Sequence, residues 1–125
     1  MEKQGFSNSE FHKITDNSVK YYVALRCSAI IGAFIELTPE SHKKETEARV
    51  GPYRDYYGLQ AFTLRGKTHP NQTTAENTIA TAELYGKIIN NYSKHTEESF
   101  ASRGTPFTAW MDEDYEICAK ILTQP

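Results

Sequence analysis

The stretch AFTLRGKT, residues 61–68, fits the loose phosphate-loop pattern of a small residue, four variable residues and then Gly-Lys-Thr. Such a loop works because small residues let successive backbone N–H groups curl around phosphates, and because a helix begins at the Lys and Thr. Here bulky residues such as Phe62 crowd the variable positions, no β-rich strand precedes them, and Pro70 falls where that helix should extend. We therefore expect no nucleotide site, but a helix that ends near Gly66 and a surface loop around Lys67.

Two His-x-x-Glu pairs have a spacing that would place an imidazole and a carboxylate on adjacent turns of a helix, where both could bind a metal ion. They are His42 with Glu45 and His95 with Glu98. Di-iron bundles use the reverse order and draw further ligands from apolar helices, whereas both pairs here lie in very polar stretches. We expect solvated surface groups and neither a metal nor another cofactor. A small enzyme or metal-binding helical bundle that uses these four residues is the alternative.

The chain has two cysteines, Cys27 and Cys118, each on the apolar face of a predicted helix. That position suits a buried thiol or half-cystine rather than a reactive thiolate. The acidic run Asp112, Glu113 and Asp114 suits a helix start, where the dipole favours negative charge, so we select no catalytic residue. Within a monomer the cysteines can pair only with each other. We expect a disulfide, which favours an exported protein; two unpaired buried thiols are the alternative.

The segment YRDYYGLQAFTLR, residues 53–65, is the strongest candidate for a binding surface. Its rings and guanidinium groups are of the types enriched at binding hot spots, and so many rings cannot all face one core from so short a segment. We select as contacts for a protein or small-molecule partner Tyr53, Arg54, Tyr56, Tyr57 and Arg65. The alternative is that the rings only cover the core of the bundle, with their hydroxyl groups pointing outward.

Apolar side chains that recur at three- and four-residue steps predict one all-α domain over residues 1–125, with a polar arm over residues 1–15. The first helix, capped by Asp16 or Asn17, should end near Leu37. Thr38 should then cap a short polar helix that begins at Pro39.

Gly51-Pro52 predicts a break, and residues 53–66 favour a helix over a strand. Thr73 and Glu76 form a capping box for a long helix that runs to about Phe100, and Asp112 should cap the last one. We expect a small bundle of four to five helices in which the first and last helices pack together.

The charge and hydropathy of the chain exclude some function classes. A net charge of −2 argues against general nucleic acid binding. The most apolar run, residues 21–37, is 17 residues long with Arg26 near its centre, so we expect no membrane span. The opening MEKQGFSNSE lacks the apolar region of a signal peptide, so the chain is either cytoplasmic or a mature exported form.

The stretches ALRCSAI and DEDYEICAKIL place one cysteine early and one late in the chain. This layout resembles small exported helical proteins, and most closely the Rap1a/Tai immunity proteins, which guard bacteria against secreted peptidoglycan amidases. The resemblance implies a periplasmic inhibitor or another partner-binding role, and no inhibitory residue is carried over from it. We therefore expect a non-enzymatic domain that binds a protein or a small ligand, and that is periplasmic or secreted, with a cytoplasmic protein as the alternative.

Overall fold

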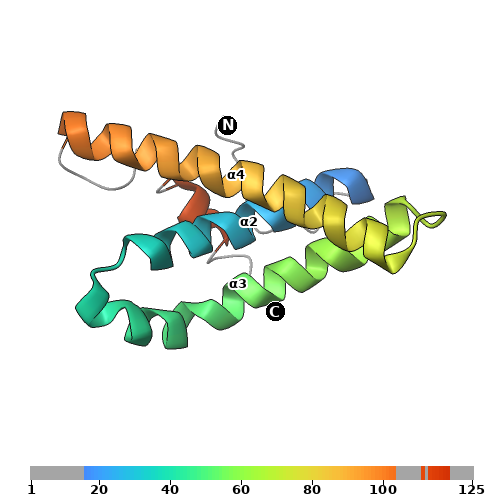
Figure 1. Ribbon diagram of the computed structural model, residues 1–125, viewed down its shortest axis with the longest axis horizontal. Coiled ribbons are helices and arrows are strands. Elements are labelled where there is room, and N and C mark those ends of the chain that lie inside the picture. The colour runs from blue at the N-terminus through green and yellow to red at the C-terminus, as the bar shows by residue number, and fades with distance from the viewer. Residues whose placement is uncertain (1–15, 104–110, 112, 119–125) are drawn as a thin grey trace.

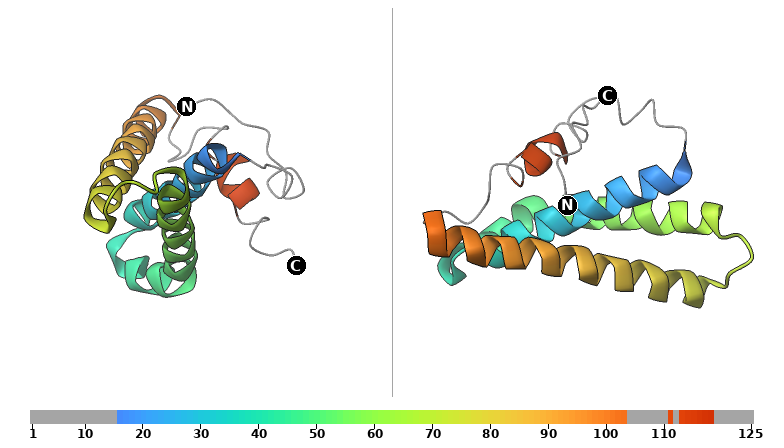
Figure 2. Two further views of the ribbon diagram at one scale, coloured as in Figure 1. Left: turned by 90° about the vertical axis from the view of Figure 1, so that its right-hand side faces the viewer. Right: turned by 90° about the horizontal axis from the view of Figure 1, so that it is seen from above.

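The computed structural model describes residues 16–103, 111 and 113–118. Its long helices are α2 (Asn17–Leu37), α3 (Glu40–Thr68) and α4 (Thr74–Arg103), and residues 113–118 form a further short helix. Helix α2 lies in the middle, with α3 on one side and α4 on the other (Figure 1). Further views show the short helix beside α2 (Figure 2). The predicted all-α bundle, with its first and last helices packed together, is confirmed.

Helix α2 forms the centre of the core because it is apolar on nearly every side, and every residue from Val23 to Ala33 is buried. By length and composition it could cross a membrane, but 67% of its most apolar window is buried within the fold. Its contact with α3 is the most extensive in the bundle. Close packing continues at Gly32, where an added Cβ would lie 2.6 Å from the hydroxyl oxygen of Tyr85 on α4.

The cap predicted at the N-terminus of α2 is confirmed, but the cap predicted for the helix that follows α2 is wrong. Asp16 accepts a hydrogen bond from the Ser18 N–H at 2.8 Å and is the N-cap. Thr38, however, does not cap the next helix. Its hydroxyl donates to the Phe34 carbonyl at 3.0 Å and so closes the C-terminus of α2, while Pro39 is the N-cap of α3 and makes no side-chain cap hydrogen bond.

Helix α3 runs without interruption through Gly51 and Pro52, so the predicted break is wrong. A proline inside a helix removes one backbone hydrogen bond and bends the axis. The extensive packing of α3 against α2 offsets this loss, since most helix stability in proteins comes from tertiary contacts, and Pro52 itself is exposed. Figure 1 shows α3 bending in its first half, with α2 on the concave side. The predicted helix over residues 53–66 is confirmed and ends two residues later, at Thr68.

The capping box predicted for α4 is confirmed. The Thr73 N–H donates to the Glu76 carboxylate at 2.8 Å, and the Glu76 N–H donates to the Thr73 hydroxyl at 3.1 Å. The helix extends to Arg103 rather than to about Phe100. The predicted polar arm over residues 1–15 and the cap at Asp112 lie outside the described residues.

Candidate binding surface

A disulfide joins the central helix to the end of the described chain. Cys27 on α2 and Cys118 on the short helix have a Cα–Cα distance of 5.5 Å and an S–S distance of 2.09 Å. Both residues are buried, as their apolar helix faces predicted, and the expected disulfide is confirmed. The alternative of two unpaired thiols is therefore dropped.

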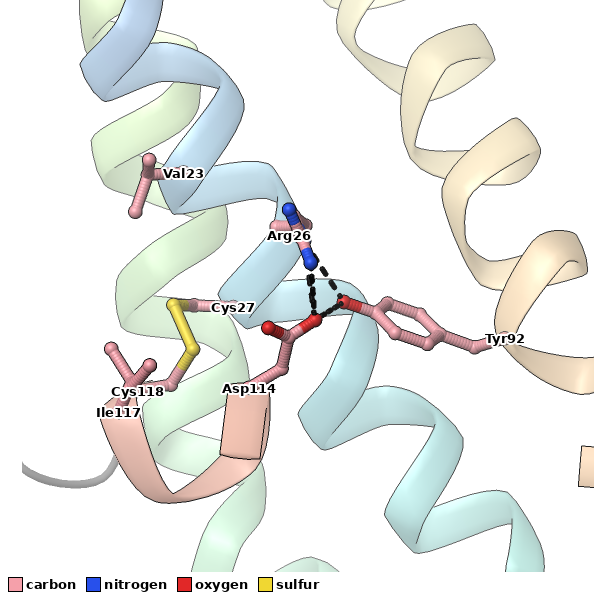
Figure 3. Close-up of a pocket in the computed structure, with 7 residues that line it drawn as sticks. All are labelled: Val23, Arg26, Cys27, Tyr92, Asp114, Ile117 and Cys118. Atoms are coloured by element: carbon pink, nitrogen blue, oxygen red, sulfur yellow. Dashed lines mark hydrogen bonds and ion pairs between the residues drawn. A yellow bond between two sulfur atoms is a disulfide. The ribbon is translucent and has the colours of Figure 1, made fainter. Parts of the chain in front are cut away.

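A buried ion pair lies directly beside this disulfide (Figure 3). Asp114 Oδ2 accepts hydrogen bonds from Arg26 Nη2 at 2.6 Å, from Arg26 Nε at 3.2 Å and from the Tyr92 hydroxyl at 2.9 Å. The side chains of Arg26 and Asp114 are only 5% and 7% exposed. The three groups come from α2, α4 and the short helix, so they join all three elements at one point.

The protonation states of Arg26 and Tyr92 follow from their burial and from their contacts with Asp114. Burial alone would lower the pKa of Arg26, but hydrogen bonds to Tyr92 and Asp114 and the negative charge of Asp114 raise it overall, so the guanidinium stays charged. Burial, and next the Asp114 charge, raises the pKa of Tyr92 far above its usual value, so its hydroxyl remains a donor. These assignments suit a fixed structural contact rather than a proton-transfer site.

The cavity at the cluster is too small for an organic ligand. It has a volume of about 20 Å³ and is lined by the disulfide, the ion pair and apolar side chains such as Val23 and Ile117 (Figure 3). A space of this size holds about one water molecule. We call the disulfide and the group of Arg26, Tyr92 and Asp114 together the C-terminal clasp, because they fasten the short helix to the bundle.

The outer face of α3 carries large side chains that the fold does not cover. Tyr53 and Tyr56 are each 48% exposed, and Leu59 is 64% exposed. Because they are spaced three residues apart, Tyr53 and Leu59 lie about 60° to either side of Tyr56 around the helix axis, so all three side chains are on one side of α3. We call these three residues the α3 ridge. It is the part of the described surface that matches the expected binding segment.

Three of the five residues predicted as contacts do not lie on this ridge. Tyr57 is 1% exposed, and its hydroxyl donates to the Cys118 carbonyl, so it is a core residue that supports the clasp. Burial, and next its neighbour Tyr56, raises the pKa of Tyr57. Arg65 donates to Asn77 at 3.3 Å and to Gln72 at 2.9 Å, and so it ties the end of α3 to the following loop and α4.

Arg54 also points away from the ridge. Its Cδ lies near Gly32 of α2, and its guanidinium pairs with Glu47 at 2.9 Å and with Asp55 at 3.0 Å. Burial acts to lower the pKa of Arg54, but the hydrogen bonds to both carboxylates raise it overall. An added Cβ at Gly51 would clash with the Glu47 carboxylate, so the glycine leaves room for this ion pair.

An open hollow of about 370 Å³ lies between the end of α2 and the start of α3. Its charged lining consists of Glu36, Glu40, Glu47, Lys43, Lys44 and Arg54. Three acidic side chains face three basic ones, and Glu40 pairs with Lys43 at 3.4 Å, as Glu47 does with Arg54. The charges therefore largely neutralise one another, and the hollow presents no field of one sign to a ligand.

The two chemical motifs found in the sequence both lie on long helices. Residues 61–68 are helical throughout, so they form no phosphate loop; Lys67 is exposed but sits in the last turn of α3 and not in a loop. His95 lies 3.6 Å from Glu98 on α4, while His42 and Glu45 are on the exposed start of α3. Within the described residues no group of three or more His, Cys, Asp or Glu side chains gathers to hold a metal ion.

Two important residues were not selected from the sequence. The helix dipole alone accounts for Asp114 in the sequence, although Arg26 in the middle of an apolar run is a signal that a buried negative partner must exist. The sequence of residues 59–64 supports both helix and strand periods, so it assigns Leu59 to no face, yet three-residue spacing from Tyr53 and Tyr56 places Leu59 on their side of the helix.

Comparisons of the chain with models of protein families, with curated proteins and with solved structures found no significant match.

Proposed function

We propose that the chain is a non-enzymatic, protein-binding helical domain that works in an oxidising compartment, and that the α3 ridge is its contact surface. The single observation that carries the proposal is the exposure of Tyr53, Tyr56 and Leu59 on one side of α3. Tyrosine is enriched among interface hot spots because its ring gives much contact area at little entropic cost. Single exposed apolar residues need no explanation, but three neighbours on one face favour a contact.

The compartment is inferred from the disulfide. Cystines persist in secreted and periplasmic proteins and are rare in the reducing cytosol. The burial of Cys27 and Cys118 protects the bond from reductants. A periplasmic or secreted protein is therefore the form that we propose, and an inhibitor of the immunity type, as in the Rap1a/Tai proteins, is one role that would use such a surface.

We propose that α2 is a core helix and not a membrane span. A charged residue in a membrane-spanning helix is costly unless it is paired inside the protein, and Arg26 is paired here with a residue of another helix. Because the buried polar groups of the clasp are occupied by one another, they favour a structural role over catalysis.

The proposal is tested by site-specific photo-crosslinking in the cells that make this protein. Benzoylphenylalanine in place of Tyr56 should give a covalent adduct of defined mass, because the ring contacts a partner there. The matched control is the same residue in place of Lys87, which is exposed on α4 and away from the ridge. If position 56 gives no adduct, or only the adducts that position 87 also gives, the proposal is wrong.

A further inference from the structure

The short helix depends on the disulfide for its position. Residues 113–118 are too few to hold a helix by themselves, because isolated helices of fewer than about 12 residues are marginal in water. Asp114 ties the first turn of this helix to Arg26. In the last turn, Cys118 is bonded to Cys27 (Figure 3). A buried ion pair adds little net stability, since the cost of taking both charges out of water offsets their attraction. The covalent bond is therefore the strongest contact that keeps the short helix docked.

Tyr57 joins the docked short helix to the α3 ridge. Its hydroxyl donates to the Cys118 carbonyl, and its ring centroid lies 5.6 Å from that of Tyr56, edge to face. Tyr53 comes four residues before Tyr57, which places it one turn earlier and about 40° away around the helix axis. Both tyrosines of the ridge therefore border a ring whose position depends on Cys118.

Without the docked short helix, Tyr57 would keep its ring in the core only at a cost. Its hydroxyl would lose the Cys118 carbonyl, and a buried hydroxyl without a partner is unfavourable. The ring would turn to bring this hydroxyl to water, and the rings of Tyr53 and Tyr56 would lose the neighbour that they border. A partner would then have to order these rings as it binds, which weakens binding.

We infer that the Cys27–Cys118 disulfide controls binding at the α3 ridge. The chain binds its partner weakly while both cysteines are thiols, and it reaches full affinity once the bond has fastened the short helix. This inference rests on the proposed binding role of the ridge and adds how that role is regulated.

The bond forms by exchange with a disulfide of a thiol oxidoreductase, which is the oxidant. One thiolate of the chain attacks that disulfide and releases one oxidoreductase thiolate, and the second thiolate of the chain then displaces the other from the mixed disulfide. The chain thus gives up two electrons and two protons, and the oxidoreductase gains two thiols.

The control acts in one direction, because both sulfur atoms are enclosed once the short helix has docked. Cys27 and Cys118 are buried, and thiol–disulfide exchange needs access to a sulfur atom. Oxidation therefore happens while the short helix is undocked, and the finished bond resists reduction. The ridge binds weakly where thiols are kept reduced and becomes active in an oxidising compartment.

Photo-crosslinking from position 56 in the cells that make this protein tests the inference. The adduct yield, per amount of chain, should fall about tenfold in the serine variant, Cys27→Ser with Cys118→Ser. Adding Tyr57→Phe to the serine variant should bring the yield back to within about threefold of the original, because a ring without a hydroxyl stays in the core. The matched control is Tyr21→Phe, which removes a hydroxyl that donates to Thr81 and is not part of the clasp; it should rescue nothing.

Equal adduct yields from the unchanged chain and the serine variant overturn the inference and leave the proposed binding role in place. A triple variant that is as weak as the serine variant also overturns it, since the loss then does not pass through the Tyr57 hydroxyl. So does a loss of the helical circular dichroism signal in the serine variant, because binding would then fail through unfolding. No adduct from the unchanged chain removes both the binding role and its control.

Discussion

The C-terminal clasp makes a strong prediction for stability. Asp114→Asn keeps the shape of the side chain but removes the charge that compensates buried Arg26. Removing one partner of a buried ion pair leaves the other charge uncompensated and costs about 3–5 kcal/mol. Because small domains have a net stability of about 5–15 kcal/mol, this single change should lower the urea midpoint steeply.

Matched variants separate this cost from general damage to the short helix. Glu116→Gln removes a charge from an exposed position of the same helix and should change stability by no more than about 0.5 kcal/mol. The double variant Arg26→Met with Asp114→Leu removes both charges. It should lose only about 1–3 kcal/mol, because the Tyr92 hydroxyl is then left without its acceptor.

The measurement is urea unfolding followed by the helical circular dichroism signal, with the disulfide intact in every variant. The reasoning is refuted if Asp114→Asn is as stable as Glu116→Gln. It is also refuted if the double variant is less stable than Asp114→Asn, since the penalty would then not come from an uncompensated buried charge.

Three further changes test the packing of the bundle. Serine at both cysteines should lower the free energy of unfolding by up to about 4–5 kcal/mol, because the bond closes a loop between residues 91 positions apart; an unchanged urea midpoint would contradict this. Gly32→Ala should destabilise by about 1–3 kcal/mol relative to Gly86→Ala, since its Cβ would meet Tyr85 and nothing lies within 4 Å at Gly86; equal stabilities would speak against the close approach. Because the folded-state pKa of Tyr92 is raised, its unfolded form ionises first, so the contribution of Tyr92 to stability is full below about pH 10 and falls above it by about 1.4 kcal/mol per pH unit. Tyr92→Phe should make that alkaline decline shallower, and an identical slope would contradict the assignment.

Local chemistry made much of the fold predictable from the sequence. The Asp16 cap and the Thr73–Glu76 box depend on groups within four residues of each other, so they could be identified directly. The pairing of Cys27 with Cys118 followed because a chain with two core cysteines offers only one intramolecular choice. In each case one short-range rule or one combinatorial constraint was enough.

The rest depends on how distant segments meet. The sequence predicts a break at Pro52 because local rules do not say whether packing against another helix will support a bent helix through it. Tyr57 differs from Tyr56 by one position, yet one is core and the other surface, since the phase of α3 is set by packing against α2. The contact between Arg26 and Asp114 spans 88 positions, and no sequence period indicates it.

The binding role of α3 is tested most directly by the size of the native complex. In extracts of the cells that make this protein, the chain should elute from a gel-filtration column well above the 14.2 kDa of the monomer. Tyr56→Ala should shift it to the monomer position, while Lys87→Ala should not. Elution of the unchanged chain at the monomer mass, or of the Tyr56→Ala variant together with the unchanged chain, would contradict a partner on the α3 ridge.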